Sequence, residues 1–444
     1  MSKLNGVDFA NISSLNGRSF FDTGGGSLSD FALAQADTGI LMWGGGGGAP
    51  EPLDFKVSDE NILVSLLPTK GQLTTDSISK GNWKFGTFGG AYLTDSGDLY
   101  TAWGDGSYGS SIGRAVTASA PKDEYHLAAS NVANFAMGYG TIMYVSTSGT
   151  FHYSGPSGNS GNPGGSSGNY GFVQLGTDTD WVSVHADPNL YHFSTVAIAV
   201  KGANGGKLYA FGGNGEGKTG QDTTSGNTTS WTLMSDGTKS GTFDVEGWTQ
   251  IRIASDSPGA IDSTGRLWRW GEGFYGALGD GTSTDIKYPQ QVGTDTDWEY
   301  LGAMRNVQLA IKGGEIWYSS SGNYGTPWGY SGATFDRTWR QKTSTGGLWE
   351  EIDSTDSEVQ NYLWTGKYNG EHCIYGSSIA GRGSFNLPTN AELTDTQNGV
   401  GGTWMRPLSD LATPVDSGST INWAYPYAAK NNSSGGFLLV SASS

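Results

Sequence analysis

Apolar and polar residues alternate in short segments along the chain, and one arrangement of these segments returns eight times. Each copy has an alternating segment, a turn that contains glycine, and a second alternating segment that ends near an aromatic residue. A period of two predicts β-strands, and glycine between two such strands predicts a β-hairpin because it readily adopts positive φ. The copies lie at residues 31–45, 91–109, 142–155, 196–217, 259–276, 307–325, 362–378 and 427–443.

The predicted turns define a long repeat. They are 49 to 66 residues apart and contain Gly39, Gly97, Gly149, Gly206, Gly265, Gly314, Gly370 and Gly436. This period is typical of a four-stranded propeller blade and is too long for a helical solenoid.

A segment with a tryptophan lies between the hairpins. Two nearly identical forms, VQLGTDTDW and QQVGTDTDW, end at Trp181 and Trp298. Shorter forms place the tryptophan at Trp83, Trp248, Trp349 and Trp404. We expect a strand with one large aromatic residue to seat it against the neighbouring blade, so each repeat has an outer and an inner strand besides its hairpin.

The segment GAIDSTGRLWRWGEGFYGALGDGTSTDIKYPQQVGTDTDW at 259–298 resembles an RCC1-like repeat, with Leu278, Gly279 and Gly281 in the positions that the family uses. The resemblance extends over residues 31–443 and implies an all-β, RCC1-like β-propeller. Family members most often have seven four-stranded blades, whereas eight hairpins are present here, so seven and eight blades both stay open. The first hairpin lacks a preceding tryptophan strand and the last lacks a following outer strand. We therefore expect the N- and C-terminal segments to pair and close the ring, giving a propeller domain at 31–444.

Residues 1–30 form a separate predicted arm with a small duplication, LNGVDFANISSLNGRSF. It resembles short N-terminal segments of tailed-bacteriophage structural proteins, which implies an anchor that docks on other virion proteins. The partner-binding candidates are Leu4, Asn5, Gly6, Ile12, Leu15, Asn16 and Gly17. The alternatives are a disordered tail and an extra strand on the first blade.

Charge and composition exclude several classes of protein. The formal charge is −17, with 25 Lys and Arg against 42 Asp and Glu, which disfavours nucleic acid as a partner. The single Cys373 cannot form an internal disulfide or a cysteine zinc site. The start of the sequence lacks the features of a signal peptide, and no apolar run reaches the roughly 18 residues of a membrane span. We therefore expect no membrane insertion and a mature chain that begins at Met1.

Two short motifs imitate catalytic or nucleotide-binding sites. Gly212, Gly217, Lys218 and Thr219 satisfy the P-loop pattern, but a P-loop must open a helix and the following QDTTSGNTTSW does not predict one. Ser166 lies in a GGSSG match to the nucleophile elbow, inside a Gly/Ser/Asn-rich loop that lacks the required strand and helix. We predict no catalytic residue and no cofactor, and interpret the P-loop match as the ordinary turn after a hairpin.

Acidic turns, histidines and aromatic residues supply the remaining candidates. The turns at 178–180, 280–282 and 295–297 offer oxygen ligands for calcium, but Asp and Thr also cap their own turns, and we predict no metal site. The histidines show no ligand spacing: His126, His152, His185, His192 and His372. Four aromatic residues are candidates for exposed binding loops or for packing between blades: Tyr275, Tyr324, Trp328 and Tyr330.

Together the resemblances imply a non-enzymatic virion structural protein, such as a tail fibre, decoration or host-attachment element, assembled in the host cytoplasm. Its expected partners are other virion proteins, bound through the arm, and a host-surface glycan or protein. The alternative is a cellular RCC1-like protein-interaction module or a glycan-binding adhesin. Polysaccharide hydrolysis needs paired carboxylates, and 42 acidic residues single out no pair.

Overall fold

The computed structural model describes residues 3–4, 7–8, 14–15, 18–19, 38–44, 62–65, 83–86, 89–102, 113, 126–138, 141–155, 169–186, 196–238, 241–253, 256–303, 307–320, 337–341, 348–354, 362–369, 371–377, 403–407, 423–431 and 434–442. These residues form β-strands and two three-residue 3-10 turns, η5 (Gly215–Gly217) and η6 (Phe274–Gly276), and contain no α-helix. The predicted all-β class is confirmed. No helix in this part of the chain is long and apolar enough to span a membrane.

Seven four-stranded antiparallel sheets are present in the described residues, and six of them pair four consecutive strands in chain order. The first to third sheets are β7 (Trp83–Gly86), β8 (Gly89–Leu93), β9 (Leu99–Ala102) and β10 (His126–Ala129); β11 (Val132–Gly138), β12 (Thr141–Ser146), β13 (Phe151–Gly155) and β14 (Asn169–Gln174); and β15 (Trp181–Ala186), β16 (Val196–Lys201), β17 (Lys207–Gly212) and β18 (Thr228–Leu233). The fourth to sixth sheets are β19 (Trp248–Arg252), β20 (Gly259–Asp262), β21 (Leu267–Gly271) and β22 (Ile286–Gln291); β23 (Trp298–Ala303), β24 (Val307–Lys312), β25 (Glu315–Ser320) and β26 (Arg340–Gln341); and β27 (Trp349–Ser354), β28 (Tyr362–Tyr368), β29 (Glu371–Ser377) and β30 (Thr403–Pro407).

The seventh sheet combines strands from opposite ends of the sequence, in the order β31 (Trp423–Asn431), β32 (Ser434–Ala442), β5 (Thr38–Gly44) and β6 (Ile62–Ser65). Strand β5 pairs with β32 along its whole length, with Gly39 opposite Ser441 and Gly44 opposite Gly436. The turns predicted at Gly39 and Gly436 are therefore wrong, because both glycines lie inside strands. The first and eighth predicted hairpins contribute to one sheet. The number of blades and the closure of the whole ring stay predictions.

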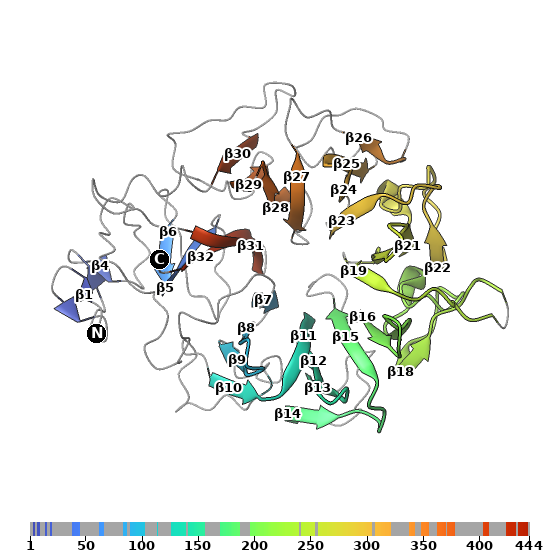
Figure 1. Ribbon diagram of the computed structural model, residues 1–444, viewed down its shortest axis with the longest axis horizontal. Helices are drawn as coiled ribbons and strands as arrows, with labels where there is room; N and C mark the ends of the chain where they lie inside the picture. Colours follow the sequence, from blue (N-terminus) through green and yellow to red (C-terminus); the bar gives the residue numbers. More distant parts are fainter. Residues whose placement is uncertain are drawn as a thin grey trace.

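The sheets follow one another around a common centre (Figure 1). The first strand of each sheet lies nearest this centre: β7, β11, β15, β19, β23, β27 and β31. Five of the predicted tryptophans begin such a strand: Trp83, Trp181, Trp248, Trp298 and Trp349. The prediction is wrong for Trp404, because this residue lies in β30, the last strand of the sixth sheet, opposite Gly376.

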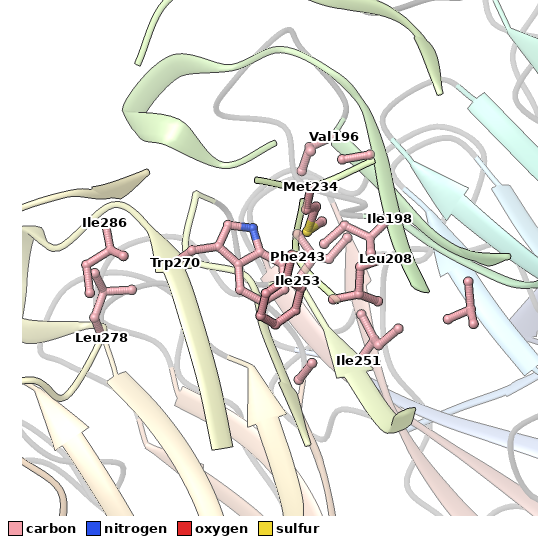
Figure 2. Packing of buried hydrophobic residues seen from close by; sticks show 13 residues of the cluster. Val196, Ile198, Leu208, Met234, Phe243, Ile251, Ile253, Trp270, Leu278 and Ile286 are labelled. Carbon is pink, nitrogen blue, oxygen red and sulfur yellow. The ribbon is translucent and has the colours of Figure 1, made fainter. Parts of the chain in front are cut away.

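Each pair of neighbouring sheets from the first to the fifth encloses its own apolar core. Figure 2 shows the core between the third and fourth sheets, where Trp270 and Phe243 lie among aliphatic side chains from both sheets. Similar cores join the first to the second sheet, the second to the third, and the fourth to the fifth. Burial of apolar surface between sheets therefore stabilises the packing of these five sheets against one another.

Two very short hairpins occur near the N-terminus. Strand β1 (Lys3–Leu4) pairs with β2 (Val7–Asp8), and β3 (Ser14–Leu15) pairs with β4 (Arg18–Ser19). The duplicated Asn-Gly dipeptides fall between the paired strands, where such dipeptides favour a two-residue hairpin connection. The boundary predicted at residue 30 lies outside the described residues, so the division into arm and propeller stays a prediction.

Candidate functional site

Several hairpin turns form a hydrogen bond with the first strand of the next sheet. We use "turn end" for the end of the sheets where the second strand turns into the third, at residues 94–98, 146–150, 201–207, 262–266 and 312–315. At four of these turns a glycine carbonyl accepts a hydrogen bond from the first residue of the next sheet: Val132 to Gly97 (2.9 Å), Trp181 to Gly149 (3.1 Å), Trp298 to Gly265 (3.0 Å) and Trp349 to Gly314 (2.8 Å).

Glycine is needed at these joints for two reasons. Gly265 has a φ of +77°, which side-chain-bearing residues rarely adopt. A Cβ added there would also clash with the carbonyl oxygen of Thr296, in the turn that leads into the next sheet, and a Cβ on Gly149 would meet the carbonyl oxygen of Thr179 in the same way. The turn glycines are thus contacts between sheets as well as turns within them.

The two GTDTDW segments form matching ion-pair units at the turn end. In the third sheet, Lys201 Nζ lies 2.7 Å from Asp178 Oδ2 and 5.2 Å from the ring centroid of Trp181. In the fifth sheet, Lys312 Nζ lies 2.6 Å from Asp295 Oδ2 and 5.0 Å from the ring centroid of Trp298. A second ring, Trp317, lies 3.9 Å from the same ammonium. Each lysine is therefore held by a carboxylate and by aromatic faces.

These contacts support the structural interpretation of the acidic turns. The first aspartate of each GTDTDW turn pairs with a lysine, and Asp280 Oδ1 accepts a hydrogen bond from the backbone N–H of Thr282 at 2.9 Å. Within the described part of the chain, no group of three His, Cys, Asp or Glu side chains is placed to hold a metal ion. The acidic turns thus use their carboxylates within the fold.

The turn end presents more exposed acids than bases. Its basic side chains form ion pairs and are at most partly exposed: Lys201 with Asp178, Lys207 with Asp244, Arg266 with Asp262, Lys312 with Asp295, and Lys367 with Glu350. The hydrogen bond between Lys207 and Asp244 raises the pKa of the lysine and lowers that of the aspartate, so both stay charged at neutral pH. Further acids are exposed around these pairs: Asp180, Asp236, Glu246, Asp297 and Glu299. This surface therefore carries net negative charge.

The second residue of each innermost strand from β11 to β27 also contributes to the surface of the turn end. These residues are exposed in five successive sheets: Ala133, Val182, Thr249, Glu299 and Glu350. Val182 is 48% exposed, and Leu348, beside Trp349, is 60% exposed. These second residues change from apolar in the second and third sheets to acidic in the fifth and sixth. A protein partner would meet both an apolar and a charged region here.

Polar side chains on the innermost strands reach across to the next sheet. Asn134 Oδ1 accepts a hydrogen bond from the backbone N–H of Val184 at 2.7 Å, and Gln250 Oε1 accepts one from that of Leu301 at 2.9 Å. The ammonium of Lys84 donates to the carbonyl of Phe135 at 2.6 Å. These bonds fix the spacing of neighbouring sheets near the centre, and the sequence pattern did not indicate them.

The histidines with described side chains form local contacts. His152 stacks on Tyr144, with ring centroids 4.6 Å apart, and its Nε2 lies 2.9 Å from Thr150 Oγ1. His185 Nε2 lies 3.1 Å from Ser183 Oγ. Burial lowers the pKa of His185 well below its ordinary value, and the charges of Lys84 and Arg252 lower it further, so this imidazole is neutral at pH 7. His192 lies outside the described residues.

The P-loop match has a structural role. Its residues 215–217 form η5, and no helix follows. Lys218 and Asp256 are 2% and 1% exposed, and Lys218 Nζ lies 2.6 Å from Asp256 Oδ1. Asn214 Oδ1 accepts hydrogen bonds from Thr219 N at 3.1 Å and Thr219 Oγ1 at 2.6 Å. The prediction of an ordinary turn after a hairpin is confirmed, and the lysine is committed to a buried ion pair.

The predicted binding residues are not brought together by the described part of the structure. Leu4 lies in β1, Leu15 lies in β3 and the backbone of Tyr275 lies in η6. The others lie outside the described residues: Asn5, Gly6, Ile12, Asn16, Gly17, Tyr324, Trp328, Tyr330 and the elbow-like Ser166. Their roles stay predictions.

Comparison with known proteins agrees with this architecture. Residues 264–300 match the Regulator of chromosome condensation (RCC1) repeat. The structure of human WBSCR16 is similar with a TM-score of 0.60 and 14% identity, over 92% of this chain and 100% of that one. Prp20p of Saccharomyces cerevisiae has a TM-score of 0.60 and 11% identity, over 95% of this chain and 96% of its own. The yeast RCC1 (Prp20) bound to Kap60 has a TM-score of 0.59 and 11% identity, over 98% of this chain and 96% of its own. No curated protein matches the chain in sequence. The chain thus contains an RCC1 repeat at 264–300 and has the fold of the RCC1-like β-propellers.

Proposed function

We propose that the protein is a non-enzymatic protein-interaction module that binds its partner with the turn end of its sheets. The observation that carries this proposal is the imbalance of charge on that surface. Lys201 and Lys312 are 18% and 14% exposed and are paired, whereas their partners Asp178 and Asp295 are 52% and 49% exposed. The field that an approaching protein meets is therefore negative, and the partner that fits it carries a basic surface.

The fold neighbours support an interaction role without identifying the partner. The structure of Prp20p is described together with its binding to Gsp1p and histones, and another structure holds yeast RCC1 with Kap60. Structural similarity at 11% identity supports a shared fold, but it does not support a shared binding site. The proposal for this chain consequently rests on its own turn end.

The proposal of a non-enzyme is supported by what the motif residues do. The lysine of the P-loop match pairs with Asp256, and the first carboxylate of each GTDTDW turn pairs with a lysine. These side chains hold the fold together instead of facing a substrate.

The comparisons favour the interaction module over a place on a bacteriophage particle. A virion location, docking through the N-terminal arm, and binding of a host glycan remain proposals from the sequence. Mass spectrometry of purified particles tests the first, and a glycan array tests the last.

Site-specific photo-crosslinking tests the proposed binding surface. A crosslinking amino acid is placed at Glu299, which is exposed at the turn end, and in a second variant at Asp280, which is exposed at the opposite end of the fourth sheet. In the native cell, position 299 should capture one defined protein that position 280 does not capture. Capture of the same protein to an equal extent from both positions would contradict the proposal that the turn end is the binding surface.

A further inference from the structure

Arg269 places a buried charge where four other sheets have neutral residues. In the hairpin of β20 and β21, the buried apolar pair nearest the turn is Ile261 with Leu267. Arg269 lies two pairs further from the turn, opposite Gly259. The equivalent pairs in the first, second, third and fifth sheets are Ala91 with Thr101, Met143 with Tyr153, Ile198 with Ala210, and Leu309 with Tyr318. The fold therefore does not need a cation at this position.

The backbone at Gly259 leaves room for the arginine. A Cβ added to Gly259 would lie 2.7 Å from Nη1 and 2.8 Å from Cδ of Arg269, and 2.9 Å from a methyl group of Leu301 in β23. The guanidinium thus lies between the fourth and fifth sheets. Gly259 and Arg269 act as a matched pair, a small residue opposite a large one.

The charge of Arg269 is not balanced by the protein groups that it contacts. Its side chain is completely buried, and Nη2 donates to the carbonyl oxygens of Ser257 and Ala277, both at 3.0 Å. Its Nε and Nη1 atoms donate to no protein atom. Asp256, the residue before Ser257, pairs with Lys218. Burial lowers the pKa of Arg269 to about 9, so the group still carries its charge at neutral pH.

A buried guanidinium has five donors and a full positive charge, and burying it with neutral acceptors alone is strongly unfavourable. Even a buried ion pair can often be replaced by apolar residues of similar volume without loss of stability, so packing does not explain why an arginine is used here. A bound negative charge would explain it, because it would accept from the remaining donors and cancel the charge.

We propose that Arg269 binds a small inorganic anion, chloride or an ion of similar size, inside the protein between the fourth and fifth sheets. Because the side chain is completely buried, a macromolecular ligand or a large organic acid has no access to it. The ion is a constituent of the fold and is independent of the proposed partner-binding surface.

The ion is tested directly on the wild-type protein. Crystals grown in chloride and soaked in sodium bromide should show an anomalous bromine peak within hydrogen-bonding distance of Nε or Nη1. In solution, sodium chloride should raise the midpoint of thermal unfolding more than sodium gluconate at equal ionic strength, by a saturable amount on the order of 1 °C.

Variants separate a bound ion from general salt effects. Arg269→Met should abolish the difference between chloride and gluconate, whereas Arg266→Met should retain it, because Arg266 is partly exposed and pairs with Asp262. Absence of a bromine peak in the wild-type crystal, with equal midpoints in the two salts, would overturn the proposal and leave water as the occupant. This conclusion stands even if the Arg269 variant fails to fold.

Discussion

The Nζ atom of Lys218 lies 2.6 Å from Oδ1 of Asp256 in the interior between the third and fourth sheets. The carbonyl of Lys218 also accepts a hydrogen bond from Trp270 Nε1 at 3.0 Å, which joins the same turn to the core. The residue that satisfies a phosphate-binding motif is thus a link between two sheets.

Removing one partner of this pair should destabilise the protein strongly. Lys218→Met leaves the Asp256 carboxylate buried without its cation, and we expect a loss of about 3–5 kcal/mol in the free energy of unfolding. The double variant Lys218→Met with Asp256→Leu should recover most of this loss, because both charges are removed. Urea unfolding of the wild type and variants measures the effect. A single variant as stable as the wild type would contradict the structural role.

The turn glycines should contribute to stability for two reasons: they adopt positive φ, and they leave room for the backbone of the neighbouring turn. Gly265→Ala is expected to lower the free energy of unfolding by about 2–4 kcal/mol, because it adds a clash with Thr296 to the strain of positive φ. Gly293 is the matched control, since its φ is +65° and an added Cβ would meet nothing within 4 Å. Gly293→Ala should cost only about 1 kcal/mol. Equal losses in thermal or urea unfolding would show that the contact is unimportant.

Asp262 should make stability depend on pH. Burial raises its pKa, but hydrogen bonds from Thr264, Trp268 and Arg266 outweigh that effect and hold the pKa below its usual value. The carboxylate therefore stabilises the fold above the unfolded pKa of about 4, and this contribution is lost as the pH falls through the lower folded value.

The matched variant for this prediction is Asp262→Asn. The difference in unfolding free energy between wild type and variant should be largest near neutral pH and should shrink as the pH is lowered below about 4. If the difference in unfolding free energy stays constant over that pH range, the effect of the substitution does not come from the charge of Asp262.

Local pattern was sufficient to predict much of the fold. The hairpins at Gly97, Gly149, Gly265 and Gly314 follow from alternation around a glycine, and this information lies within about fifteen residues of sequence. The pairing of β5 with β32 joins segments that are far apart in the chain, and local pattern therefore predicts turns at Gly39 and Gly436, where the structure has strands. Sequence pattern cannot separate the two cases, because a glycine next to an apolar segment occurs both in hairpin turns and within strands.

The contacts of the candidate site were harder to predict. Lys201 and Lys312 are the last residues of β16 and β24, directly before a hairpin turn, and each follows a GTDTDW segment in the sequence. That recurrence was a usable signal for an Asp–Lys–Trp unit. The pairing of Lys218 with Asp256 had no such signal, because it joins two loops whose proximity depends on the packing of two sheets.

The proposal that the turn end binds a basic partner is tested most directly by charge reversal. Asp297 and Glu246 are exposed there, and Asp280 is the exposed control at the opposite end. The measurement is the affinity for a basic polypeptide, poly-L-lysine, as a function of salt. The wild type should bind with an affinity that falls as salt rises. Asp297→Lys with Glu246→Lys should weaken binding by about tenfold or more, whereas Asp280→Lys should change it by less than about twofold. Equal weakening by both variants, or no binding by the wild type at low salt, would contradict the account.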